Sequence, residues 1–194
     1  MAGHFEALPG GGAAVALDEV EISILRSLAV QLMELIGPGD EPVEGEDPLA
    51  ALFAEGPSEP PSDPALRRLF PDAYGDDTDE LRQAAADFRR YTENDLRARK
   101  RDDALSVVRS LDALASAAAG EGGGVLKLTA DESRAWLGSL NDLRLTIGTR
   151  LEVTDDDQSE GLYRLPDDDP RKPMVMAYLW LGGLQESLVE TLMP

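Results

Sequence analysis

The sequence predicts a mainly α fold, a bundle of four to five helices, together with a candidate short two-stranded β-ribbon. Apolar residues recur at helical spacing along much of the 194-residue chain, and Pro, Gly and capping residues mark where these segments begin and end. Two short apolar runs, 13–17 and 125–128, have the length and composition of strands. The length fits one helical domain over residues 1–194.

Each candidate strand leads directly into a helix start. Asp18 is followed three residues later by Glu21, and Thr129 is followed three residues later by Glu132. This spacing lets the first side chain and the returning carboxylate satisfy free backbone N–H groups at a helix N-terminus. Any strand-to-helix junction can look like this. The more specific hypothesis is two related strand–helix units whose strands pair antiparallel.

Two loops are predicted. Residues 38–64 are rich in Pro, Gly and acid, with one short helix expected at 47–53, and Asp63-Pro64 begins another short helix that stops before Pro71. The second, an acidic loop over 154–172, precedes the last helix.

A long central segment begins with acidic residues at Asp76–Glu80, as the helix dipole favours. Its expected buried stripe consists of Leu81, Ala85, Phe88, Thr92 and Leu96. Between Leu96 and Ala104 the only apolar side chain is Ala98, which predicts a break or kink; the alternative is one continuous helix that bridges solvent.

The last two predicted helices carry the strongest apolar stripes. The first has Trp136, Leu137, Leu140, Leu143, Ile147 and Leu151, with Arg144 at its margin. A guanidinium held partly out of water needs a carboxylate or carbonyl partner, and Asn141 lies on the same flank. The second, opened by Pro173, has the stripe Met176, Leu179, Trp180, Leu184, Leu188 and Leu192. Its remaining surface is also apolar, which predicts a central helix or a homo-oligomer interface.

Composition excludes several classes of function. Lys plus Arg number 18 against 38 Asp plus Glu, a net charge of −20, which argues against nonspecific binding to nucleic acid or an anionic membrane. The chain has no cysteine, so disulfides, a thiolate nucleophile and a thiol switch are excluded, and its one histidine is His4 in a Gly-rich stretch. The first basic residue is Arg26, and the longest apolar run, 174–184, is too short to span a bilayer. We therefore expect a cytoplasmic protein.

Metal and cofactor chemistry are not expected. Counting from Asp156 puts Gly161 and Asp167 at calcium-loop positions, but Gln158 and Arg164 replace acidic ligands. Acidic residues are so abundant that their adjacency carries little information. A non-enzymatic protein without cofactor is the prediction, and a carboxylate or metal-dependent enzyme is an alternative.

The basic segment of the central helix is the candidate partner-binding site. It is the one place where the minority charge gathers, and it suits an acidic protein partner better than DNA, whose direct contact is not expected. The alternative is a solvated helix face paired with Glu93, Asp95, Asp102 and Asp103. The candidate residues are Arg89, Arg90, Arg97, Arg99, Lys100 and Arg101, together with Asn141 and Arg144 on the later helix.

Three blocks suggest a family. Trp136–Leu145 with Gly148–Leu151, the stretch Asp95–Arg101, and the closing block Tyr178–Gln185 resemble the AosR-type oxidative-stress transcriptional regulators, an actinobacterial domain of unknown function. The resemblance implies a regulator that acts through a sigma factor or RNA polymerase. Its implied gene neighbourhood also leaves open an adaptor linked to proteolysis or sulfur metabolism. The redox sensing attributed to the family uses cysteine thiols, which this chain lacks.

Overall fold

The computed structural model describes residues 3–37, 56–75, 77–120, 122–153, 161–162 and 164–193. Within these residues the fold is mainly α, as predicted, with a small antiparallel sheet. The predicted short helix at 47–53 and much of the predicted acidic loop lie outside the described residues. The elements are β1 (Glu6–Ala7), β2 (Ala13–Asp18), α1 (Glu19–Ile36), α3 (Pro64–Leu69), α4 (Asp79–Ala117), β3 (Gly123–Leu128), α5 (Ala130–Arg150) and α7 (Lys172–Leu192).

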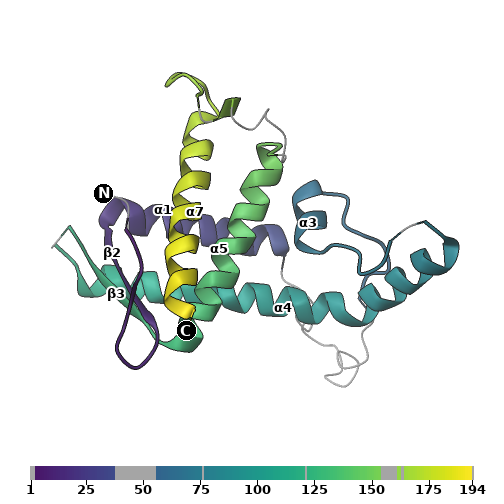
Figure 1. The fold of residues 1–194 in the computed structure, drawn as a ribbon, viewed down its shortest axis with the longest axis horizontal. Coiled ribbons are helices and arrows are strands. Elements are labelled where there is room, and N and C mark those ends of the chain that lie inside the picture. The colour runs from purple at the N-terminus through teal and green to yellow at the C-terminus, as the bar shows by residue number, and fades with distance from the viewer. Residues whose placement is uncertain are drawn as a thin grey trace, which may run out of the picture.

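The helices form two crossed pairs. Helices α5 and α7 lie side by side and run across α1 and α4, which also contact one another (Figure 1). The sheet lies at one end of α4, while the N-terminal half of α4 extends with α3 toward the opposite end. No helix in the described part of the chain is long and apolar enough to cross a membrane.

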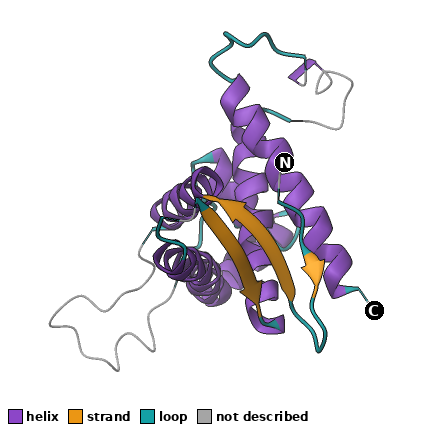
Figure 2. Ribbon diagram, turned by 90° about the vertical axis from the view of Figure 1, so that its left-hand side faces the viewer, coloured by secondary structure: helices purple, strands orange, loops and turns teal. Residues whose placement is uncertain are grey.

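The predicted β-ribbon is confirmed. Strands β2 and β3 pair antiparallel (Figure 2), with Val15 opposite Leu126. Alternate side chains of both strands are buried in the core. The two-residue strand β1 extends the sheet beyond β2. The turn into β2 requires glycine at position 12, because its φ is +92° and a Cβ atom there would lie 2.2 Å from the carbonyl oxygen of Leu128.

Both predicted capping boxes are present. The N–H of Glu21 donates to Asp18 Oδ1 at 2.8 Å, and the N–H of Asp18 donates to Glu21 Oε2 at 3.0 Å. Thr129 and Glu132 make the equivalent reciprocal bonds at the start of α5. Together with the antiparallel pairing of β2 and β3, the two boxes give the two strand–helix units that the sequence predicts. That the two units are related stays a prediction.

The predicted break in the central segment is wrong, because α4 is a single continuous helix from Asp79 to Ala117. A kink within it stays a prediction, and the stretch does not bridge solvent as the alternative supposed. The stretch without apolar residues is stable as a helix because its long basic side chains reach neighbouring elements. Arg97 Nη1 donates to the carbonyl oxygen of Ile36 at 2.6 Å, and Lys100 Nζ donates to Asp142 Oδ1 at 2.7 Å. Contacts from charged side chains here replace those of an apolar stripe.

The buried faces of two helices differ from the predicted stripes. In α4, Phe88 is 49% exposed, while Arg89 is buried. In α7, Met176 and Leu179 are exposed although they were expected in the stripe. Leu184 and Leu188 are buried as expected, together with Val175, Leu181 and Ser187. A helix that is apolar all round does not reveal its inner face by periodicity alone.

Candidate functional site

A charged network lies buried where α4 passes the segment after α3. Arg89 and Glu93 are only 4% and 3% exposed and form an ion pair one helical turn apart. Arg89 also donates to Asp72 Oδ1 and to the carbonyl oxygen of Phe70, each at 2.9 Å. Arg97 donates to the other Glu93 oxygen, through Nη2 at 2.7 Å and Nε at 2.9 Å. These bonds hold the segment after α3 against α4.

Basic side chains of α4 also stabilise the C-terminus of α1. Helix α1 has no basic residue in its own last turn, and its final carbonyl groups carry partial negative charge. Arg97 donates to Ile36 and Arg101 donates to Gly37, so both guanidinium groups lie at this end. The Arg97 guanidinium also lies over the Phe70 ring, 4.3 Å from its centroid.

Lys100 forms a second inward contact, with α5. Its ammonium pairs with Asp142, whose side chain is 2% exposed. Burial raises the pKa of Asp142, and the hydrogen bond from Lys100 opposes that shift. Burial also raises the pKa of the neighbouring Asp103, which lies on α4 against Gly138 of α5. The α4–α5 contact is therefore built partly from charged groups.

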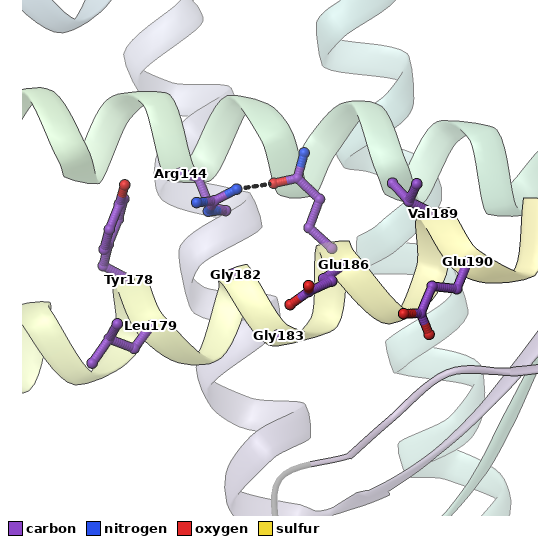
Figure 3. A pocket seen from close by; sticks show the side chains of 9 residues that line it. Arg144, Tyr178, Leu179, Gly182, Gly183, Glu186, Val189 and Glu190 are labelled. Atoms are coloured by element: carbon purple, nitrogen blue, oxygen red, sulfur yellow. Dashed lines mark hydrogen bonds between the residues drawn. The ribbon is translucent and has the colours of Figure 1, made fainter. Parts of the chain in front are cut away.

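Arg144 lies at a separate place, between α5 and α7 (Figure 3). Its Nη1 donates to Gln185 Oε1 at 2.6 Å, and Gln185 Nε2 donates to Asn141 Oδ1 at 3.5 Å. The carbonyl partner expected for Arg144 is thus the side-chain amide of Gln185. Asn141 does not contact Arg144 by a hydrogen bond of its own in the described structure; it accepts one from Gln185 and so helps to orient that amide. Arg144 also packs on Tyr178, with the guanidinium carbon 5.3 Å from the ring centroid. It borders an open cavity of about 690 Å³ that includes Gly182.

The structure therefore divides the predicted partner-binding residues among different surroundings. Arg89, Arg97, Lys100 and Arg101 use donors within the chain, as described above. Arg90 is half-buried, and its carbonyl oxygen accepts the N–H of Gly56 at 2.8 Å. Arg99 is exposed. Asn141 and Arg144 are half-buried at the α5–α7 cavity, away from the basic segment. Their binding of a partner stays a prediction.

Exposed aromatic side chains of α4 were missed by the sequence reasoning. Tyr91 is 67% exposed, and Phe88 meets the exposed Tyr74 edge to face at 6.2 Å between ring centroids. The apolar periodicity predicts Phe88 in the buried stripe and does not distinguish Tyr91. The sequence does contain one signal for this arrangement, the spacing of four between Arg89 and Glu93. Side chains at this spacing can form an ion pair, which allows the Arg89 side of the helix to be buried and leaves Phe88 exposed.

No group of three or more His, Cys, Asp or Glu side chains within the described ranges could hold a metal ion. The calcium-loop candidate begins at Asp156, outside those ranges.

Comparisons with known proteins show the family to which the chain belongs. The family described as Domain of unknown function (DUF2017) matches residues 2–192, and the chain belongs to it. Among curated relatives, "Oxidative stress regulator AosR" of Mycobacterium tuberculosis and of Mycobacterium bovis are each 32% identical over 176 residues, covering 89% of this chain and 78% of theirs. "Putative oxidative stress regulator AosR" of Mycobacterium leprae is 34% identical, covering 89% and 79%. No solved structure matches significantly.

Proposed function

We propose that this chain is a non-enzymatic, cytoplasmic regulator of transcription that binds a sigma factor or RNA polymerase through the outer face of α4. The names of its relatives support a regulatory role, since they are called oxidative stress regulators. One observation supports the outer face of α4 as the binding surface: it carries a row of exposed large side chains, while the opposite face of the helix is buried. We call this row the α4 outer stripe; it consists of Leu81, Phe88, Tyr91 and Arg99.

The residue types of the stripe favour a protein partner. Aromatic residues and arginine contribute most of the binding energy in many protein interfaces, because they combine apolar area with a polar group. Successive residues of the stripe lie seven, three and eight positions apart, so they share one side of a helix with 3.6 residues per turn. Asp95 is exposed on the same side, so the stripe has mixed charge and does not form a purely basic track for nucleic acid.

The arrangement of the buried charges favours binding over catalysis. The carboxylates of Glu93 and Asp142 accept hydrogen bonds from arginine and lysine side chains of α4. Asp142 therefore joins α5 to α4, and Glu93 fixes two arginine side chains of its own helix. The lack of cysteine places any response to oxidants outside thiol chemistry of this chain, for example in the partner.

The test is retention of transcription proteins by the tagged full-length chain. Purified sigma factors and RNA polymerase from the organism that encodes it are passed over wild type and the double variant Phe88→Ala/Tyr91→Ala. Truncating one such anchor costs about 2 kcal/mol, or about thirtyfold in Kd. Val20→Ala is the matched control, since Val20 is exposed on α1. The proposal is rejected if wild type retains neither protein, or if the double variant retains them as well as wild type does.

A further inference from the structure

Helix α7 has an exposed apolar face that nothing described in the chain covers. Met176, Leu179, Val189 and Met193 are 54%, 42%, 36% and 68% exposed. With Gly183, Glu186 and Glu190 between them, these residues form the side of α7 turned away from the core, which we call the α7 outer face. Large apolar side chains gathered along one helix are typical of an association surface.

The charge of this helix suits a second copy of the same chain. The whole chain carries a net charge of −20, so most encounters between two copies are repulsive. Helix α7 has only Lys172, Glu186 and Glu190 as ionised side chains among its 21 residues. The helix therefore carries a net charge of only −1, so two copies meet there with less repulsion than over most of the surface.

Arg144 beside this face has unused hydrogen-bonding capacity. Its Nη1 is bonded to Gln185, but its Nε is buried and has no hydrogen-bond partner among the described residues. A Cβ atom added at Gly182 would lie 3.6 Å from this Nε, so the guanidinium packs closely against the backbone of α7 at this glycine. A buried donor without an acceptor is costly, and a carboxylate would supply the acceptor.

Suitable carboxylates lie on the same helix. Glu186 and Glu190 line the cavity that Arg144 borders, and neither makes an ion pair with Arg144 in the described structure (Figure 3). The cavity thus places a guanidinium that has one unpartnered donor beside two carboxylates that are not paired with it. A two-fold symmetric contact pairs such groups twice, because each copy gives its carboxylate to the other.

We propose that two copies of this chain form a symmetric dimer, with their α7 helices crossing antiparallel at Gly183. An antiparallel crossing at this residue brings Glu186 of one copy beside the Tyr178–Gly182 stretch of the other, where Arg144 lies. Gly182 and Gly183 permit close approach, and a Cβ atom at Gly183 would meet nothing within 4 Å in the single chain. The dimer uses α7 and leaves the α4 outer stripe free, so it does not depend on the proposed function.

The test is the mass of the full-length chain in solution. Sedimentation equilibrium at about 100 µM is expected to show dimers for wild type, as for an interface with a Kd in the micromolar range. Gly183→Leu is the main variant, because its side chain enters open space and the monomer folds normally, as circular dichroism will check. It should weaken dimerisation at least about tenfold. Val125→Leu is the control, since Val125 is exposed on β3.

Charge reversal tests the pairing. Arg144→Glu and Glu186→Arg should each weaken the dimer, and the double variant should recover most of the loss. A monomeric wild type at this concentration overturns the proposal, as does a dimer that Gly183→Leu leaves unchanged. If wild type is monomeric and Gly183→Leu instead abolishes retention of a transcription protein, the face binds that protein, and the dimer is refuted.

Discussion

Replacing Glu93 by leucine tests whether the buried network of α4 holds the fold together. The carboxylate is 3% exposed and accepts hydrogen bonds from two guanidinium groups, those of Arg89 and Arg97. Its removal leaves Arg89 buried with only Asp72 and the Phe70 carbonyl as acceptors. Breaking a buried ion pair costs about 3–5 kcal/mol of unfolding free energy. Because Arg89 keeps two acceptors, we expect a loss at the lower end of this range, about 3 kcal/mol.

Urea unfolding followed by the helical circular dichroism signal measures this loss. The control is Asp112→Leu, which breaks the pair between Arg26 and Asp112, another contact of α1 with α4. Those side chains are about half exposed, so the expected cost is below about 1 kcal/mol. The double variant Arg89→Met/Glu93→Leu should recover part of the loss, because the buried charge of Arg89 is removed together with that of its partner. Equal costs for Glu93→Leu and Asp112→Leu would refute the reasoning.

Three further predictions use the same unfolding measurement. Asp103→Asn should stabilise the fold at neutral pH. Burial raises the pKa of Asp103 in the folded chain above its ordinary value of 3.8. The ionised carboxylate therefore destabilises the fold increasingly as the pH rises from 3.8 through the raised pKa. The gain should vanish below about pH 4, and a gain independent of pH would contradict this origin. Arg144→Leu should cost about 1.5 kcal/mol through the lost charged donor to Gln185, whereas no cost would mean a solvent-exposed guanidinium. Gly12→Ala should cost about 2 kcal/mol, and Gly11→Ala less, because φ is positive at both but only Gly12 faces a backbone oxygen; equal costs would remove the contact from the explanation.

The features that could be predicted from sequence are local ones. Each capping box, at Asp18 and at Thr129, depends on two residues only three positions apart. The strand that precedes each box is a short apolar run, which is also a local signal. Their pairing follows because each would otherwise expose an unpaired edge. Helix α3 was likewise recognisable from Asp63, which caps it, and from Pro64 at its first turn.

The inner faces of α4 and α7 could not be predicted in the same way. In α4 the apolar Phe88 competes with the charged Arg89 for the buried side, and Arg89 is buried because Glu93, Asp72 and the Phe70 carbonyl together satisfy its charge and donors. Asp72 and Phe70 are distant enough in sequence that no period reveals them. In α7 the period is uninformative because both sides are apolar.

On the long α4 helix, adjacent residues point about 100° apart, so the proposed recognition surface and the buried network can lie side by side. Phe88 is exposed beside buried Arg89, and exposed Arg99 precedes Lys100, which pairs inward with Asp142. Truncating Phe88 should therefore weaken partner binding with little change in unfolding, while Glu93→Leu should lower stability and, through that, binding. If instead Phe88→Ala destabilised the chain as much as Glu93→Leu, the exposed side of α4 would be part of the structural core in solution, and the proposed recognition surface would have to lie elsewhere.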